Sequence, residues 1–495
     1  MLLTIGLEIH IKLKSENKMF CQCKNEQNFE NLQANTNICP VCTGQPGALP
    51  TLSEEVLRKA LILGKALNCE INNPSQFDRK SYFYPDLPMG YQITQLYKPT
   101  NVKGKVSFFV DNEYSQERTI HIQDAHMESD TGKMIHQGGE ALLDFNRAGT
   151  PLVEIVTLPD FTSADEVVEF LKELQRIVRY NNIADADMEK GQMRCDVNIS
   201  IREKESDPYG TRVEVKNMNS FAAIKRAIQY EYDRQSDLYN KGEKFDQQTR
   251  GRDDTKGESY LMRSKEDALD YRYFPEPDLP PLLLDDSTLQ HLSASILEIP
   301  YRIIKKFKQE FGFHKEYINA IISDKETLDY FLDILSHCEK GNEKTNAPLI
   351  KGDLGGFAKL IAKRISGPIS ARMKENFKSI NELNFTKDKF QQFLKIAQEG
   401  KILDNQLKIV MDEMIKTGKN PEEIIKEKGF DKPAIDNNEL ENIVKLVLQE
   451  NPAIVEQYKG GKTTTLGFFV GQVMKKTGGK VDPKTVGDKI IKELS

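Results

Sequence analysis

The sequence predicts an α+β protein: an antiparallel-sheet domain with flanking helices, followed by an all-helical part. Two observations support this fold class. Several segments before residue 285 alternate apolar and polar residues with a period of two, whereas the rest of the chain has mainly helical spacing. Four prolines between Pro275 and Pro281 mark the change, because neither a helix interior nor a central strand accommodates them.

Five segments indicate where the sheet lies. Residues 4–13, 193–202 and 211–218 each place apolar side chains on one face and polar ones on the other, which is typical of a sheet with one face on a core and one open to water. Residues 103–110 and 114–122 predict a hairpin. In the later part, helical spacing runs over 293–312, 325–340, 381–399 and 439–449, with glycine-rich joints at 352–356 and 478–479.

Length and composition restrict the class of protein. At 495 residues the chain is too long for one core, so we expect several domains. No stretch approaches the roughly 20 apolar residues of a membrane helix, and the alternating N-terminus lacks the apolar block of a signal peptide. We therefore expect a cytoplasmic protein without membrane contact, in which clustered cysteines hold a metal rather than form disulfides.

The charge distribution leaves two interpretations open. The net charge of −6 argues against a protein that coats nucleic acid indiscriminately, but allows a local basic patch. Residues 456–495 carry eight lysines and four acidic residues. This end of the chain either contacts RNA or is a solvated lysine-rich helical segment.

Two cysteine pairs predict a structural zinc site. Cys21 and Cys23 are followed after fifteen residues by Cys39 and Cys42. Zinc takes four soft ligands in a tetrahedron, and two close pairs joined by a loop supply them. Four sulfur ligands would leave no open position, so the predicted role is structural. The alternative is four ordinary buried thiols. The isolated Cys195 lies on the apolar side of its strand, which favours core packing.

Acidic and histidine side chains are placed to converge on the polar face of the sheet. Glu8 and His10 lie two apart on one strand, so their side chains project from the same side about 7 Å apart. His126 and Glu128 repeat this spacing, and Glu154 stands in an apolar run where a lone carboxylate needs a partner. Such a group suits Mg²⁺ carrying the phosphates of ATP. Taken singly, each residue is also explained as a solvated strand residue or half of a salt bridge.

Several catalytic motifs are missing. Lys462 and Thr463 follow two glycines, but the first glycine of a phosphate-binding P-loop would fall at Glu456. The sequence has no dinucleotide-binding fingerprint, nucleophile elbow or H-E-x-x-H motif. It also lacks the serine-rich stretch with which an amidase releases ammonia from glutamine. If nitrogen transfer is involved, another chain must supply the ammonia.

Eight segments resemble the B subunit of the tRNA-dependent amidotransferase, the GatB and GatE family, over nearly the whole chain. They are residues 5–13, 35–50, 77–95, 142–156, 193–201, 213–221, 261–281 and 467–483. The resemblance implies a cradle-shaped catalytic sheet domain over 1–290, with a Cys₄ zinc insertion near 21–42. It further implies a helical domain over 291–400 and a small YqeY-like helical tail over 401–495 that binds tRNA.

The resemblance also implies a reaction and partners. With Mg²⁺ and ATP, a protein of this family phosphorylates the side-chain carboxylate of Glu or Asp esterified to tRNA. Ammonia that the A subunit releases from glutamine then displaces the phosphate, within a heterotrimer that also contains the C subunit. The products are Gln-tRNA(Gln) and Asn-tRNA(Asn). The sequence leaves open whether Glu-tRNA(Gln), Asp-tRNA(Asn) or both are substrates.

Site residues follow from the matched motifs. The implied metal ligands, the first four of them catalytic, are Glu8, His10, Glu128, Glu154 and Asp196. Weaker matches for ATP phosphates or the aminoacyl end are Lys80, Tyr82, Asn198, Lys216 and Asn217. The implied tRNA contacts are Lys475, Lys476 and Lys480, which a basic helix end beside a glycine cap also explains. One departure is Ser129, where the family pattern has a second Glu, so that a metal would be held through Ser129, a water or Asp130.

Two other classes of protein fit parts of the sequence. A zinc-stabilised RNA adapter without chemistry of its own would explain the cysteines and the basic end, but would not need the acidic residues on the sheet. An aminoacyl-tRNA synthetase would need a pair of HIGH-like and KMSKS-like motifs, and the sequence contains no such pair.

Overall fold

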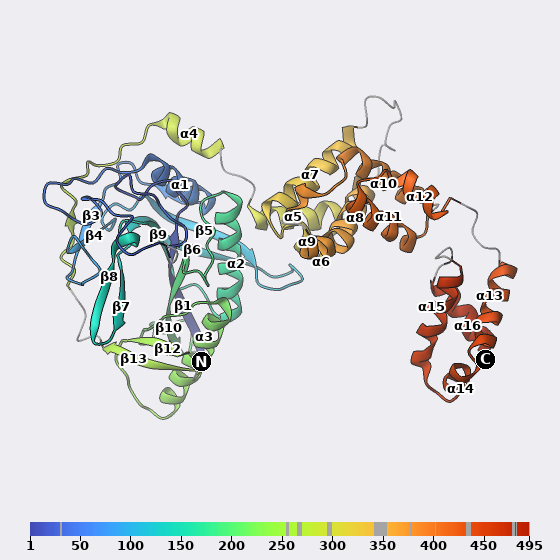
Figure 1. The fold of residues 1–495 in the computed structure, drawn as a ribbon. Helices are drawn as coiled ribbons and strands as arrows, with labels where there is room; N and C mark the ends of the chain where they lie inside the picture. The colour runs from blue at the N-terminus through green and yellow to red at the C-terminus, as the bar shows by residue number, and fades with distance from the viewer. Residues whose placement is uncertain are drawn as a thin grey trace. The chain divides into compact units, whose positions relative to one another are not determined.

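The computed structural model describes residues 1–29, 32–253, 257–264, 270–294, 299–340, 354–376, 379–400, 402–431, 437–477, 481 and 483–494. The chain divides into two compact units, Met1–Lys305 and Lys306–Ser495 (Figure 1). The first contains a large sheet with helices, and the second is helical in the part that the structure describes. The predicted α+β class is therefore confirmed.

Nine described strands of the first unit form one sheet in the order β13-β12-β11-β10-β1-β9-β6-β5-β2. Neighbours are antiparallel except the parallel pair β11 and β12. The bounds are β1 Leu2–Lys12, β2 Glu70–Ile71, β5 Asn101–Phe109, β6 Glu117–Ser129, β9 Pro151–Thr157, β10 Met193–Arg202, β11 Val213–Lys216, β12 Gln248–Asp253 and β13 Glu258–Ser264. The hairpin predicted from residues 103–122 is present as the antiparallel pair β5 and β6.

One face of the sheet lies on the core, as the alternation in β1 predicts. Ile5, Leu7, Ile9 and Ile11 of β1 are at most 1% exposed. Their core also contains apolar residues of α1 (Glu54–Ala66), α2 (Ala164–Tyr180) and α3 (Phe221–Asn240). Helix α2 begins with a capping interaction, in which the hydroxyl of Ser163 accepts a hydrogen bond from the backbone N–H of Glu166 at 3.2 Å. The opposite face therefore carries the polar residues of β1.

Strand β6 changes the face to which its alternate residues point. The buried apolar positions are Ile120 and Ile122 in its first half, and Ala125 and Met127 in its second half. The change occurs where the register against β9 shifts, between the pairs Ile122–Thr157 and Asp124–Val156. An extra residue in one strand reverses the side-chain alternation beyond it. As a result, Asp124, His126 and Glu128 lie on the polar face.

Two smaller sheets flank this layer. One has the order β14-β3-β4, formed by Phe274–Pro275, Asp78–Ser81 and Tyr91–Thr94, and the other is the hairpin of β7 (Lys133–Gln137) and β8 (Glu140–Asp144). Pro275 therefore lies in an edge strand, a position that tolerates proline because one side of the strand needs no N–H donor. The prolines mark the end of the sheet region, and Pro275 is itself part of it.

The remaining helices match the predicted spacing in part. Residues 293–312 do not form one helix: α4 is Asp286–Ala294, and α5 begins at Pro300, which suits a first helical position. The prediction over 325–340 is confirmed by α7, whereas α10 begins only at Lys387, after Thr386 caps it. In the predicted joint 352–356, Gly355 and Gly356 lie in the first turn of α8 (Leu354–Arg364).

The other helices are α5 Pro300–Phe311, α6 Lys315–Ile321, α7 Lys325–Lys340, α9 Ser370–Asn376, α10 Lys387–Glu399, α11 Asp404–Thr417 and α12 Pro421–Lys428, with a π-helical turn η3 over Ile365–Ile369.

The last helices have a hydrophobic core of their own. They are α13 Asn437–Glu450, α14 Pro452–Lys459, α15 Leu466–Lys476 and α16 Pro483–Leu494. Val444, Phe469, Val473 and Ile490 are fully buried together in this core. Short helices of this kind are stable because they share one packed interior.

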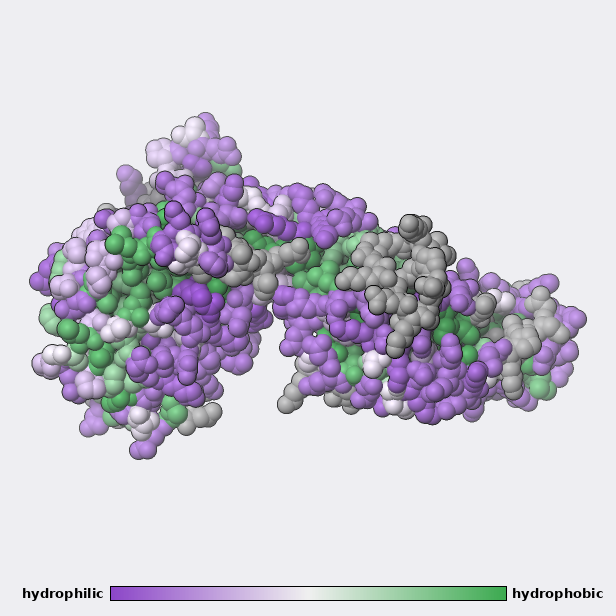
Figure 2. Space-filling view, turned by 90° about the horizontal axis from the view of Figure 1, so that it is seen from above, coloured by the Kyte–Doolittle hydropathy of each residue, from purple (hydrophilic) through white to green (hydrophobic). Residues whose placement is uncertain are grey.

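The surface of the molecule is mainly hydrophilic in the view from above, with hydrophobic residues gathered in patches on the first unit (Figure 2). Phe83 and Leu283 of that unit are 90% and 79% exposed. Within the described ranges, none of the helices has the length and apolar composition needed to span a membrane.

Candidate active site

His10 lies between two carboxylates on the polar face of the sheet. Its Nε2 is 3.1 Å from Oε1 of Glu128 and 3.4 Å from Oε2 of Glu154. Glu154 stands directly opposite His10 because of the register of β9 against β1, and the shift in β6 brings Glu128 to the same face. One ligand atom from each of the three side chains lies within 4.8 Å of the others. We call these three residues the His10 cluster.

The charges in the His10 cluster support one another. Burial alone would lower the pKa of His10, but hydrogen bonds and the negative charges of Glu128 and Glu154 raise it well above its ordinary value. Burial likewise opposes ionisation of Glu154, yet contacts with His10 and His126 hold its pKa well below the usual range. The two carboxylates thus favour the protonated form of His10.

A second acidic cluster lies beside the first. Ligand atoms of Glu8, Asp196 and Glu214 are within 4.8 Å of one another, and we call these residues the Glu8 cluster. The ammonium of Lys216 contacts Asp196 and lies 2.9 Å from Glu214. The amide of Asn198 donates to Oε1 of Glu8 at 3.0 Å. Burial raises the pKa of Glu8, as do the charges of Glu154 and Glu214.

Glu214 was not among the predicted site residues. It lies on the polar side of the same short strand as Lys216, and this was the only signal that the sequence offered. The position of Glu214 in the Glu8 cluster depends on the pairing of β10 with β11, which places it opposite Asn198.

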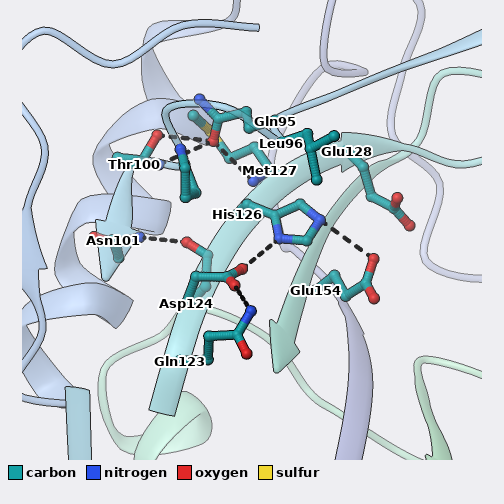
Figure 3. A network of polar contacts seen from close by, with 12 residues as sticks. Gln95, Leu96, Thr100, Asn101, Gln123, Asp124, His126, Met127, Glu128 and Glu154 are labelled. Atoms are coloured by element: carbon teal, nitrogen blue, oxygen red, sulfur yellow. Dashed lines mark hydrogen bonds and ion pairs between the residues drawn. The ribbon is translucent and has the colours of Figure 1, made fainter. Parts of the chain in front are cut away.

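His126 stands behind Glu154, between it and Asp124 (Figure 3). Its Nδ1 is 2.7 Å from Oδ1 of Asp124, and its Nε2 is 3.2 Å from Oε2 of Glu154. Burial alone would lower the pKa of His126, but these two carboxylates raise it to about 10. Asp124 and His126 are thus linked to the His10 cluster through Glu154.

The other predicted ligands lie at different distances from the clusters. Burial raises the pKa of Tyr82, and so does the charge of Glu128. The ammonium of Lys80 lies 4.9 Å from the ring centre of Tyr271, which packs edge-on against Tyr82. Asn217 contacts the sulfur of Met262 and joins neither cluster.

Ser129 and Asp130 are not directed at the His10 cluster. The hydroxyl of Ser129 donates to the backbone carbonyl of Ile93 at 3.4 Å, on the side of the strand opposite to Glu128. Asp130 forms ion pairs with Arg194 at 3.0 Å and Arg147 at 3.4 Å. The suggestion that Ser129 or Asp130 replaces a missing glutamate ligand therefore finds no support in this geometry.

The four cysteines gather at one point. Sulfur atoms of Cys21, Cys23, Cys39 and Cys42 lie within 4.8 Å of one another. The backbone N–H of Cys39 donates to Sγ of Cys42 at 3.2 Å, and the fully buried Lys18 places Nζ 3.7 Å from the same sulfur. A hydrogen bond from Cys21 and the nearby charge of Lys18 outweigh burial and lower the pKa of Cys42 to about 5. Such a donor set fits a tetrahedral Zn²⁺. Cys195 is 2% exposed in the core, where the sequence favoured it.

Two of the three predicted tRNA contacts lie in the last helices. Lys475 and Lys476 are in the last turn of α15, where the ammonium of Lys476 also pairs with Glu450 at 2.9 Å. Lys480 and the glycines at 478–479 lie outside the described residues.

Comparison with known families defines the class of this protein. Residues 3–290 match the model of the GatB/GatE catalytic domain, and residues 351–494 match that of the GatB domain. The chain therefore belongs to the GatB/GatE family, and the resemblance drawn from its motifs is confirmed.

Full-length relatives make the assignment more particular. The B subunits of the aspartyl/glutamyl-tRNA(Asn/Gln) amidotransferase from Clostridium kluyveri and Pseudothermotoga lettingae are each 41% identical to this chain. Both alignments cover 99% of this chain and 98% of the relative. The protein of the same name from Persephonella marina is 40% identical with the same coverage.

Proposed function

We propose that this chain is the B subunit of a tRNA-dependent amidotransferase, in which its sheet domain phosphorylates the side-chain carboxylate of Glu-tRNA(Gln), Asp-tRNA(Asn) or both. The observation that carries the proposal is the pair of acidic clusters around Glu8 and His10 on one open sheet face. An RNA adapter has no use for five converging carboxylates, which cost free energy wherever they are partly buried.

The chemistry follows from the poor reactivity of a carboxylate. One carboxylate oxygen attacks the γ-phosphorus of ATP, the bond to the β–γ bridging oxygen breaks, and ADP leaves. The nitrogen of ammonia then attacks the acyl carbon, phosphate departs with the carboxylate oxygen, and loss of a proton leaves the amide. Because this chain has no recognisable amidase motif, the ammonia comes from the A subunit, within a complex that also contains the C subunit.

The residues on the sheet face fit a divalent cation. Carboxylate oxygens and one imidazole are ligands that suit Mg²⁺, and they lie in two adjacent clusters. Bound there with ATP, Mg²⁺ would offset the negative charge that develops on the transferring phosphoryl group. The polyphosphate of ATP could not otherwise approach the carboxylates of Glu8, Glu128, Glu154, Asp196 and Glu214. The ammonium of Lys216, beside Asp196 and Glu214, would bind a phosphate oxygen.

Other parts of the chain support this role. The cysteine cluster holds a structural Zn²⁺, since four sulfurs leave no position for a substrate. The catalytic domain ends near residue 290, and the helical domain ends near residue 400. The tail beyond it binds the tRNA backbone through Lys475, Lys476 and Lys480. A reaction on aminoacyl-tRNA takes place in the cytoplasm.

The test uses the chain assembled with its A and C subunits. Given ATP, glutamine and either misacylated tRNA, the complex should form ADP, and mass spectrometry of the aminoacyl-tRNA should show the amide. Glu8→Ala and His10→Ala should abolish both products. His121→Ala is the matched control, because His121 lies on β6, the strand that carries Glu128, but is 59% exposed and pairs with Asp160. Full activity in Glu8→Ala and His10→Ala would favour the adapter instead.

A further inference from the structure

Asp124 and His126 form a shielded pair behind Glu154. The His126 ring stands between the two carboxylates, 2.7 Å from Asp124 and 3.2 Å from Glu154 (Figure 3). The side chains are only 13%, 13% and 15% exposed, so water competes little for these contacts. A third carboxylate, Glu128, lies on the same face and contacts His10.

The pair exists because of the register shift in β6. Without the extra residue, Asp124 and His126 would continue the alternation of Ile120 and Ile122 and enter the core. Such a shift disrupts the hydrogen bonding between strands, so its presence calls for a compensating gain. Here it turns Asp124 and His126 toward Glu154.

Glu154 contacts two imidazoles through the same oxygen. Nε2 of His10 and Nε2 of His126 lie 3.4 and 3.2 Å from Oε2 of Glu154. His126 is in turn held by Asp124, so the position of the Glu154 carboxylate beside His10 depends on this pair.

We propose that His126, itself fixed by Asp124, is a positioning residue that holds the Glu154 carboxylate in place as a ligand for a divalent cation at His10 and Glu128. This inference rests on the metal site of the proposed function. It adds that Asp124 and His126 form the support of that ligand.

The alternative is an ordinary ion pair that stabilises the sheet. The same strand offers a comparison, since Nδ1 of His121 lies 2.8 Å from Oδ2 of Asp160. That pair has the same chemistry and nearly the same distance, but His121 is 59% exposed and contacts neither cluster. A merely structural role would make the two pairs equivalent with respect to metal binding.

Binding of Mn²⁺ to the full chain, measured by calorimetry and electron paramagnetic resonance, separates these roles. In His126→Asn the amide nitrogen stands near the position of Nδ1 and faces Asp124, so that Glu154 loses its partner. In His126→Gln the longer side chain keeps an amide nitrogen near the position of Nε2. His126→Asn should weaken Mn²⁺ binding about 10–100-fold, with most of the affinity retained in His126→Gln. His121→Gln should bind as the wild type does.

A double-mutant cycle shows whether the effect passes through Glu154. In a Glu154→Gln background, His126→Asn should cause no further loss of affinity. If His126→Asn does not fold, Asp124→Ala provides the same comparison, and a structure with bound Mn²⁺ should show Glu154 as a ligand.

The outcomes separate this inference from the proposed function. If the wild-type chain binds no Mn²⁺ at His10 and Glu128, the metal site of the proposed function fails, and the positioning role fails with it. If the wild type binds and His126→Asn binds equally well, the positioning role alone is refuted. A structure with bound Mn²⁺ in which Glu154 is not a ligand would refute it too.

Discussion

Glu8 and His10 lie two residues apart on β1, yet they belong to different acidic clusters. His10 contacts Glu128 and Glu154, whereas Glu8 lies with Asp196 and Glu214. Because alternate residues of a strand project from the same face, this one segment of backbone fixes the separation of the two clusters. In the proposed function, a metal-bound nucleotide and a substrate carboxylate meet across that separation.

Loss of the Lys216 ammonium should impair phosphoryl transfer. The side chain contacts Asp196 and Glu214, and it becomes available to a phosphate oxygen when a metal ion neutralises these acids. Lys216→Met should lower kcat for amidation by about 10²–10³-fold, the usual effect of removing one group that stabilises developing charge. Lys225→Met is the control, since Lys225 pairs with Asp165 on the surface. A change of less than about twofold in Lys216→Met would remove Lys216 from the site.

The register shift in β6 can be tested by stability. A regular strand would place residues 123 and 127 on the same face, but Gln123 is exposed and Met127 is fully buried. Met127→Lys should destabilise the chain by several kcal/mol because it buries an unpaired charge. Gln123→Lys should change the free energy of unfolding by about 0.5 kcal/mol or less. Equal effects of the two substitutions in denaturant titrations would show that β6 has no such shift.

Zinc content should depend on the cysteine cluster alone. The purified chain should contain one zinc per molecule by mass spectrometry of the metal, and Cys39→Ala should lose it together with thermal stability. Cys69→Ala should keep the metal, because Cys69 is an isolated buried thiol outside the cluster. Full zinc content in Cys39→Ala would contradict a four-cysteine site.

The basic end of α15 should contribute to tRNA binding through phosphate contacts. Lys475→Ala should weaken binding to every tRNA alike and reduce the slope of log K against log salt by about 1. Lys489→Ala serves as the control, since this lysine of α16 pairs with Glu441 at 2.6 Å. An unchanged salt dependence in Lys475→Ala would leave these lysines as a solvated helix end.

The sequence predicted what depends on local alternation. The strand of Glu8 and His10, the strand of Asp196 and the two cysteine pairs are visible in a short window of residues, and the structure places them as expected. The sequence could not show the shift in β6, because one extra residue leaves no mark in composition. Simple alternation from Ile120 onward would have directed His126 into the core.

Register explains the other differences. Glu214 enters the Glu8 cluster only through the pairing of β10 with β11, a contact between strands that no single segment encodes. Ser129 was considered as a substitute ligand because it stands where the family pattern has a second Glu, but consecutive strand residues point to opposite faces. The supporting role of Asp124 depends on both effects, the shift in β6 and the opposing Glu154.

The fate of one oxygen atom tests the central claim most directly. The assembled complex would be given ATP, glutamine and tRNA charged with Glu or Asp carrying ¹⁸O in the side-chain carboxylate, and the released phosphate would be analysed by mass spectrometry. If the carboxylate is phosphorylated, each phosphate released during amide formation carries one ¹⁸O. Glu8→Ala and His10→Ala should release no labelled phosphate. Amide formation by the wild type with unlabelled phosphate would contradict the account.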